Sequence, residues 1–330
     1  MEYKRLGKTG LKVSRLCLGT MTFGNQCDET ISHKVLNYAL ESGISFIDTA
    51  DIYPANGKPE LVGETEKIIG RWIQQKRENV VLATKFWAPT GKNPWQGGSS
   101  RRNIKDSVEA SLRRLQTDYI DLYQVHFPDY ETPIEETLGA LNDLVRQGKI
   151  LYAGCSNYPA WLLALTLGKS ENASTIRFDT VQPRYNLLFR QPERELFELC
   201  DFADIGVIPY NPLAGGFLTG KHKREAPVKG SRFTLEGGQG ERYLERYWSE
   251  QKHDVVDALK PLANEAGITL AHLAVGWVLS NPVITSPIVG ATKPSQLDDA
   301  IKAVNNPLGD DLVSAINDLT LEFRRGDDSR

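Results

Sequence analysis

Disulfide and metal signals are scarce in this chain of 330 residues. Its four cysteines, Cys17, Cys27, Cys155 and Cys200, are scattered and lack a C-x-x-C spacing, which argues against a disulfide framework and a thiolate metal site. No two histidines stand four residues apart, so the zinc-binding pair of a helix is missing as well. We therefore expect no metal and four reduced thiols that mostly pack in the interior.

Membrane and export signals are equally scarce. No run of about 18 apolar residues occurs, which is the length a helix needs to span a bilayer. Residues 1–6 contain no apolar core of signal-peptide length. We expect a cytoplasmic protein without a membrane partner.

The chain also lacks a basic excess and a phosphate-binding loop. It has 39 Lys and Arg against 42 Asp and Glu, a net charge of −3, so we expect no nucleic-acid partner. No G-x-G-x-x-G follows a strand-like run, which argues against a Rossmann dinucleotide site. Gly168-Lys169-Ser170 resembles the end of a P-loop, but Leu163 occupies the position of its first glycine, and we reject it.

What is present is an alternation of strand-like and helix-like patterns. The strand-like runs are apolar throughout, as in a parallel sheet that is buried on both faces. Eight of them are expected, at 15–18, 44–47, 80–83, 120–125, 150–153, 180–182, 207–209 and 288–289. Eight such units in a chain of this length favour an α/β fold of the (β/α)8 TIM-barrel type, with residues 1–330 forming one domain.

Helices are expected between these strands, at 30–42, 61–75, 102–115, 133–147, 159–168 and 193–202. In the helix at 102–115, Ile104, Val108, Leu112 and Leu115 form one apolar stripe. At the start of the helix at 133–147, Thr132 is an expected N-cap, with Pro133 in the first position and Glu135 completing a capping box.

Three segments lie outside this rhythm. Residues 3–13 predict a β-hairpin that covers the N-terminal end, or bottom, of the barrel. Residues 211–249, after the seventh strand, contain no clean strand–helix unit, and so long a loop at the C-terminal rim is typical of a functional segment. Beyond Pro307 we expect a further helix at 308–323 and a charged, frayed end at 324–330.

Ionisable side chains follow three successive strands. Asp48 ends the second strand and Tyr53 stands five residues later, Lys85 ends the third strand, and His126 ends the fourth. In a parallel barrel these four side chains meet at one rim. Each residue type alone is ordinary at such a place, but four compatible types together indicate proton-transfer chemistry.

The chemistry follows from the residue types. A free phenol has a pKa of about 10, and a neighbouring ammonium favours its ionised form. We expect Lys85 to lower the pKa of Tyr53, Asp48 to hold the Lys85 ammonium, and His126 to donate a hydrogen bond to a carbonyl oxygen beside the phenol. The four residues would then form a general acid with an orienting donor.

Longer motifs extend this pattern over nearly the whole chain. They are Asp48-Thr49-Ala50-x-x-Tyr53, Thr84-Lys85, Gln124-Val125-His126, Gly154-Cys155-Ser156-Asn157, Gln182 in its strand, Pro209-Tyr210-Asn211-Pro212-Leu213, and Gly290-Ala291-Thr292 followed by Gln296-Leu297. In these motifs the sequence resembles the aldo-keto reductases. The resemblance implies a TIM barrel that reduces aldehydes and ketones to alcohols with NADPH, with NADH as a second option.

The resemblance also implies roles for particular residues. The catalytic tetrad would be Asp48, Tyr53, Lys85 and His126, with Tyr53 protonating the carbonyl oxygen as hydride leaves nicotinamide C4. The cofactor would be held at its carboxamide by Ser156, Asn157 and Gln182, at its ring by Tyr210, along its pyrophosphate by the backbone amides of Leu213, Gly215 and Leu218, and at its adenosine end by Gly290, Thr292, Lys293, Gln296 and Asp299. Asn211 and Lys221 are further expected cofactor contacts. Two positions depart from the usual pattern of the family. Pro54 stands where the family often has Gly, and Gln296 stands where some branches have Arg. Lys293 could still meet a 2′-phosphate.

The substrate is a small carbonyl compound in this interpretation. Phe23, Trp87 and Phe127 are expected to form its pocket, and further aromatic residues stand nearby at Trp95, Tyr130, Tyr243, Tyr247 and Trp248. Aromatic walls with one polar end suit aldehydes and ketones with an apolar body.

Two alternatives stay open at this point. Some barrels of this kind resemble accessory subunits of potassium channels, which bind cofactor, turn over slowly and carry an assembly interface. The same residues could also oxidise an alcohol with NAD(P)⁺, because a catalyst serves both directions. Assembly into a homo-oligomer is open as well.

Overall fold

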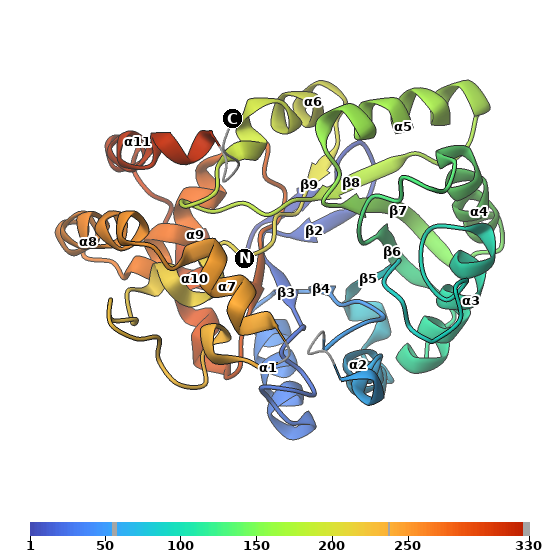
Figure 1. Ribbon diagram of the computed structural model, residues 1–330, viewed down its shortest axis with the longest axis horizontal. Coiled ribbons are helices and arrows are strands. Elements are labelled where there is room, and N and C mark those ends of the chain that lie inside the picture. Colours follow the sequence, from blue (N-terminus) through green and yellow to red (C-terminus); the bar gives the residue numbers. More distant parts are fainter. Residues whose placement is uncertain (55–57, 237, 326–330) are drawn as a thin grey trace.

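The computed structural model describes residues 1–54, 58–236 and 238–325. Gly237 in the long loop and the last part of the predicted charged tail, 326–330, lie outside this range. Figure 1 shows a central ring of strands with helices around it.

Eight parallel strands form the barrel. They are β3 (Cys17–Gly19), β4 (Phe46–Asp48), β5 (Val81–Phe86), β6 (Ile120–Val125), β7 (Ile150–Ser156), β8 (Phe178–Gln182), β9 (Gly206–Val207) and β10 (Ile288–Gly290). The order in the sheet is β10-β3-β4-β5-β6-β7-β8-β9, and parallel bridges from Val207 to Ile284 and from Tyr210 to Ile288 close the ring. Each strand overlaps a predicted run, so the (β/α)8 prediction is confirmed.

Helices surround the sheet. They are α1 (Glu29–Glu41), α2 (Glu64–Ile73), α3 (Arg101–Leu115), α4 (Ile134–Arg146), α5 (Ala160–Ala173), α6 (Leu196–Phe202), α8 (Glu250–Glu265), α9 (Leu270–Ser280), α10 (Asp298–Asn305) and α11 (Asp310–Leu319). Of these, α1 to α6 and α11 lie at predicted places, whereas α8, α9 and α10 were not among the predicted helices. In α3 the predicted apolar stripe is buried, and the Ser100 hydroxyl caps the first turn by accepting a hydrogen bond from the Asn103 N–H.

The predicted cap of α4 is wrong. The helix begins at Ile134, and Pro133 precedes it without a side-chain cap. The Thr132 hydroxyl instead donates to Asp129 Oδ2 at 2.8 Å, and Asp129 also accepts hydrogen bonds from the Ser99 and Glu131 N–H groups. This hydrogen bond orients the hydroxyl toward Asp129, and its oxygen accepts no hydrogen bond from an N–H of the first turn of α4.

The N-terminal hairpin closes the bottom of the barrel, as predicted. Strands β1 (Tyr3–Arg5) and β2 (Lys12–Ser14) pair antiparallel. Leu6 and Val13 are fully buried and pack with Phe46, Leu122 and Ile208 inside the ring. The hairpin therefore removes the apolar lower end of the barrel from water.

Gly7 tests this contact. Its φ is +57°, and a Cβ at this position would lie 2.6 Å from the Asp179 carbonyl oxygen and 2.7 Å from the Gly206 nitrogen. We expect Gly7→Ala to lower the free energy of unfolding by about 1–3 kcal/mol, because backbone must shift on both sides. Gly10→Ala is the matched control, since nothing lies within 4 Å of its added Cβ. Equal denaturation midpoints for the two variants would contradict close packing of the hairpin against the bottom of the barrel.

The segment after β9 departs from the repeat, as predicted. It contains two short 3-10 helices, η4 (Ala214–Thr219) and η5 (Arg232–Thr234), and the helix α7 (Gln239–Tyr247). Figure 1 draws α7 over the edge of the ring nearest β3. The segment thereby covers the side of the barrel at which the strands end.

No single helix in the described ranges is long and apolar enough to cross a membrane. The helices α8 and α9 meet the length and composition only as a pair, with a bend of 92° between them. Residues 272–278 of α9 are buried against the rest of the barrel.

Candidate active site

A cavity of about 970 Å³ opens at the carboxyl ends of the strands. It reaches from Asp48, Tyr53 and His126 at one end to Thr292, Gln296 and Asp299 at the other. This volume is near the upper end of the range for ligand-binding pockets. The cavity is therefore large enough for an elongated ligand and a second, smaller ligand together. This is the rim at which TIM barrels carry their active sites.

A buried ion pair forms the base of the cavity. Lys85 Nζ lies 2.5 Å from Asp48 Oδ2 and donates to the Thr49 carbonyl oxygen at 2.8 Å. The Lys85 side chain is completely buried. Gln124 and Gln182 both donate to Asp48 Oδ1, at 3.2 and 2.9 Å. Burial favours the neutral amine, but Asp48 and Tyr53 outweigh it and raise the pKa of Lys85, which stays charged.

Tyr53 lies directly above this pair. Lys85 Nζ is 5.0 Å from the centre of the Tyr53 ring, and the phenol faces the cavity. Burial raises the pKa of Tyr53, and Lys85 only partly opposes that rise. The predicted net lowering of this pKa is therefore wrong, because removal from water penalises the phenolate more than one ammonium stabilises it. Tyr53 holds its proton firmly at neutral pH, as a proton donor must.

His126 stands beside the phenol. The two rings are 5.9 Å apart at an angle of 76°. Burial and then Lys85 hold the pKa of His126 well below its usual value, so the imidazole is neutral at pH 7. Its Nδ1 is buried and has no hydrogen-bond partner among the described residues. A neutral ring offers one N–H donor toward a ligand oxygen.

The low pKa of His126 predicts how stability depends on pH. The folded state binds fewer protons than the unfolded state once the pH drops below about 6.5, the value of a free imidazole. Stability is therefore lost as the pH falls from about 6.5 toward the pKa of the folded state. We expect this loss to be less steep in His126→Gln than in the wild type, as measured by urea unfolding between pH 7 and 5. Parallel curves for the two proteins would contradict a buried neutral His126.

The residues predicted to hold a carboxamide form one hydrogen-bonded set. The Ser156 hydroxyl donates to the Gln182 carbonyl oxygen at 2.8 Å, and Asn157 Nδ2 donates to the His126 carbonyl oxygen at 3.0 Å. The Tyr210 hydroxyl donates to Asn157 Oδ1 at 2.9 Å. All four side chains line the cavity or its floor. This set therefore fixes the ring of Tyr210 relative to the strand ends that carry Asp48 and His126.

Strained backbone marks the same rim. Trp87, Asn157 and Asn211 have φ values of 129°, 62° and 68°, and each stands at or just beyond a strand end. A non-glycine residue with positive φ costs energy that the surrounding structure must supply, and such residues gather at functional sites.

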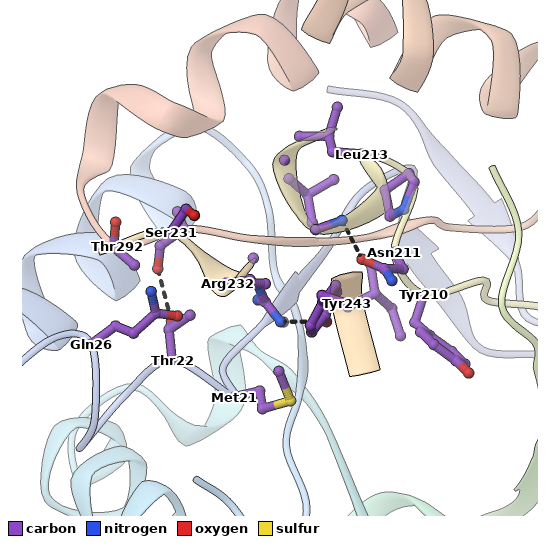
Figure 2. Close-up of a pocket in the computed structure, with 18 of the residues that line it drawn as sticks. Met21, Thr22, Gln26, Tyr210, Asn211, Leu213, Ser231, Arg232, Tyr243 and Thr292 are labelled. Carbon is purple, nitrogen blue, oxygen red and sulfur yellow. Dashed lines mark hydrogen bonds between the residues drawn. The ribbon is translucent and has the colours of Figure 1, made fainter. Parts of the chain in front are cut away.

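The loop after β9 forms one wall of the cavity (Figure 2). Asn211 Oδ1 accepts a hydrogen bond of 2.8 Å from the Gly215 N–H. The ring of Tyr243 lies against Gly215, where a Cβ would be 2.5 Å from it, and the Tyr243 hydroxyl accepts from Arg232 at 3.0 Å. Gly215 must be glycine here, since its φ of +70° and the close aromatic ring leave no room for a side chain.

Cations gather at the far half of the cavity. Burial lowers the pKa of Lys221, and the positive charges of Arg232 and Lys293 lower it further. Among the described residues, no carboxylate forms an ion pair with any of these three side chains. Lys293 stands beside Thr292 and Gln296, whose amide oxygen accepts hydrogen bonds from both the N–H and the hydroxyl of Thr292. Mutually repelling cations around an open cavity suit phosphate groups of a ligand, so these residues fit a dinucleotide.

The structure brings most of the predicted site residues together. The cavity is lined by Asp48, Tyr53, His126, Phe127, Ser156, Asn157, Gln182, Tyr210, Asn211, Leu213, Gly215, Lys221, Gly290, Thr292, Lys293, Gln296 and Asp299. Lys85 lies behind this wall, in contact with Asp48.

Besides Lys85, three predicted positions do not line the cavity. Phe23 is fully buried in the hydrophobic core, because the chain turns after β3 and presents Met21 and Thr22 instead. Trp87 packs against Phe127 at 5.3 Å, and it is Phe127 and Ala88 that face the cavity. Leu218 is buried beneath the loop. The predictions of Phe23 and Trp87 as pocket walls are therefore wrong, whereas the expected contact of Leu218 runs through its backbone amide and stays a prediction.

Other lining residues escaped the sequence analysis. Most belong to the loop after β3 or the segment after β9, namely Met21, Thr22, Gln26, Ser231, Arg232, Gln239, Arg242 and Arg246. These segments have no hydrophobic periodicity from which the side chains that face the cavity could be predicted. The only available signal was the concentration of basic residues in a long loop at the active-site rim.

Comparison with known proteins agrees with this geometry. The family model described as "Aldo/keto reductase family" matches residues 15–320. The chain belongs to the aldo/keto reductase family. As a member, it is an NAD(P)H-dependent oxidoreductase of the TIM-barrel class.

Individual aldo/keto reductases match along almost their whole length. An oxidoreductase of Bacillus subtilis strain 168, YrpG, is 40% identical, over 97% of this chain and 96% of that protein. A protein of Arabidopsis thaliana named as a probable voltage-gated potassium channel subunit beta is 39% identical, over 92% of each chain. The protein tas of Escherichia coli K12 is 35% identical, over 96% of each chain.

Proposed function

We propose that this aldo/keto reductase reduces aldehydes and ketones to alcohols, with Tyr53 as the general acid. The observation that carries the proposal is the buried Lys85–Asp48 pair, with its ammonium 5.0 Å from the centre of the Tyr53 ring at the floor of the cavity. An ammonium at this place stabilises negative charge on the phenol oxygen once the proton has left. It therefore stabilises the charge that develops during the reaction, even though burial keeps Tyr53 protonated beforehand.

Each residue of the tetrad then has a defined task. A bound nicotinamide supplies hydride to the carbonyl carbon. Tyr53 delivers its proton to the carbonyl oxygen, and neutral His126 donates a hydrogen bond to the same oxygen and orients it. Asp48 holds Lys85 in place, and Gln124 and Gln182 hold Asp48. The tetrad is thereby rigid before substrate arrives, which reduces the reorganisation that the reaction requires.

The proposed cofactor contacts come from the family resemblance and are supported by the presence of most of these residues along one cavity. Ser156, Asn157 and Gln182 would hold the carboxamide, and Tyr210 would cover one face of the nicotinamide ring. Leu213 and Gly215, with the Leu218 backbone behind them, would follow the pyrophosphate beside Lys221 and Arg232. Gly290, Thr292, Gln296 and Asp299 would surround the adenosine.

We propose NADPH as the preferred cofactor. Lys293 stands at the adenosine end of the cavity, and Lys221 and Arg232 raise the positive potential around it. A 2′-phosphate adds about two negative charges, which these cations favour. NADH lacks that group and would bind more weakly through the remaining contacts.

An accessory role is the second candidate. The relative from Arabidopsis thaliana is named as a channel subunit, so a chain of this family can be assigned a role in assembly with another protein. In that reading this chain would bind cofactor, turn over slowly and form a stable oligomer. Oxidation of an alcohol by the same residues is a change of direction and needs no other site.

One experiment separates these functions. The protein of residues 1–330, which we propose forms one domain, is given NADPH or NADH and a panel of aromatic and aliphatic aldehydes. Its mass is measured in parallel by light scattering. The proposal predicts aldehyde-dependent oxidation that is faster with NADPH. Tight cofactor binding, a stable homo-oligomer and negligible turnover on every aldehyde would support the accessory role instead. Fractionation of the source cells would test the expected cytoplasmic location.

A further inference from the structure

The inner surface of the cavity carries more positive charge than the cofactor explains. Six cationic side chains line it, namely Lys221, Lys229, Arg232, Arg242, Arg246 and Lys293. Among the described lining residues the only carboxylates are Asp48, which is paired with Lys85, and Asp299 at the adenosine end. Most of the positive charge is therefore uncompensated by the protein.

Five of these six cations form two groups. Lys221, Arg232 and Lys293 lie close enough for the two neighbours to depress the pKa of the Lys221 ammonium. Arg246 and Arg242 lie on α7 with Tyr247, whose hydroxyl accepts a hydrogen bond of 3.1 Å from Nδ2 of Asn211, the residue after Tyr210. Burial raises the pKa of the Tyr210 phenol, and Arg246, Arg184 and Arg242 oppose that rise. Tyr210 is hydrogen-bonded to Asn157, which in turn holds the backbone of His126. The second group thus lies on the catalytic side of the cavity.

The two arginines share one face of α7. Arg242 and Arg246 stand four residues apart, one helical turn, and both line the cavity. Neither forms an ion pair with a carboxylate of the described chain, although Glu241 and Glu245 belong to the same helix. Like charges at this spacing repel each other. An anion between them would remove the repulsion and fill the donor positions of both guanidinium groups.

The catalytic end of the cavity has an apolar wall. Ile52, Ala88 and Phe127 line it near Tyr53 and His126, and Tyr243 of α7 lies close enough to Tyr53 to affect its phenol. A substrate that fits this end has an apolar body between these side chains. Its reactive carbonyl points to Tyr53, and its other end meets α7.

We infer that Arg242 and Arg246 bind an anionic group of the substrate, so that the preferred substrates are carbonyl compounds that carry a carboxylate or a phosphate. This inference rests on the proposed reductase function and specifies its substrate class. Guanidinium groups suit both anions, because their planar donor pairs match the oxygens of either group. The two arginines are binding residues and take no part in proton transfer.

Matched aldehydes test the inference. The substrates are 4-carboxybenzaldehyde and 4-formylphenyl phosphate, with the uncharged methyl 4-formylbenzoate as reference, at saturating NADPH. The measured quantity is kcat/KM for each anionic aldehyde divided by kcat/KM for the ester. In the double variant Arg242→Gln, Arg246→Gln we expect this ratio to fall about tenfold or more, the loss of charge-assisted hydrogen bonds to one anion. The wild-type ratio should also fall with added salt.

Two further variants make the result specific. Arg242→Lys with Arg246→Lys keeps the charge and should retain part of the ratio. Arg5→Gln, on exposed β1 at the other end of the barrel, is the matched control and should leave the ratio unchanged. A preference for only one of the two anions supports the inference and identifies the group.

Other outcomes overturn it. A ratio that the double glutamine variant does not change removes the assignment while the reductase function stands. An increase in the NADPH dissociation constant equal to the loss in kcat/KM would assign the arginines to the cofactor instead. Failure of the wild type to reduce any of the three aldehydes, the ester included, overturns the proposed function and the inference with it.

Discussion

Tyr53→Phe should lose roughly 10²- to 10⁴-fold in the rate of carbonyl reduction, the usual contribution of a general acid. The variant removes one oxygen and leaves the ring in place above Lys85. Because the proposed cofactor contacts come from other residues, the dissociation constant for NADPH should change by less than about threefold. The loss should therefore lie in kcat, measured from the disappearance of reduced nicotinamide.

A conservative control keeps this result interpretable. Tyr3→Phe makes the same chemical change at an exposed position on β1, far from the cavity. It should leave both kcat and cofactor binding as in the wild type. Reduction by Tyr53→Phe at a rate near that of Tyr3→Phe would remove Tyr53 as the proton donor.

Lys85→Met should produce the largest loss of stability of any single substitution in the site. It leaves the Asp48 carboxylate buried without its ammonium partner, and breaking a buried pair in this way costs about 3–5 kcal/mol. Catalysis should be lost as well, because nothing then stabilises negative charge on Tyr53. Urea unfolding at pH 7 measures the first effect and aldehyde reduction the second.

Comparison variants separate charge from packing. Lys34→Met, on an exposed position of α1, should change the free energy of unfolding by no more than about 0.5 kcal/mol. Adding Asp48→Asn to Lys85→Met removes the uncompensated charge and should restore part of the stability, but none of the activity. If the single variant were as stable as Lys34→Met, the ion pair would not hold the base of the cavity.

The barrel was predictable because its signals are local. Each buried strand is a short apolar run, and the parallel order brings strand ends to one rim, so Asp48, Lys85 and His126 could be placed together from sequence. The hairpin at the bottom followed from strand-like runs on both sides of a turn. The cap of α4 failed because Asp129, which lies outside the capping pattern, captures the Thr132 hydroxyl.

The cavity walls were harder to predict because they depend on tertiary packing. Phe23 and Trp87 stand near the rim in sequence, but the turn of the backbone decides which neighbour faces the cavity. The pKa of Tyr53 depends on the balance between burial and the Lys85 charge, and sequence contains only the second. The arginines of α7 lie in a segment without a strand–helix pattern, so their inward orientation came only from the structure.

The central claim is that this site transfers hydride from cofactor to a carbonyl carbon with a proton from Tyr53. The most direct test uses NADPH that carries two deuterium atoms at nicotinamide C4, an aromatic aldehyde, and mass spectrometry of the alcohol. The account predicts one deuterium on the former carbonyl carbon with the wild type, formed at least about 100-fold more slowly with Tyr53→Phe. Alcohol without deuterium, no alcohol at all despite bound cofactor, or equal rates for the two proteins would contradict it.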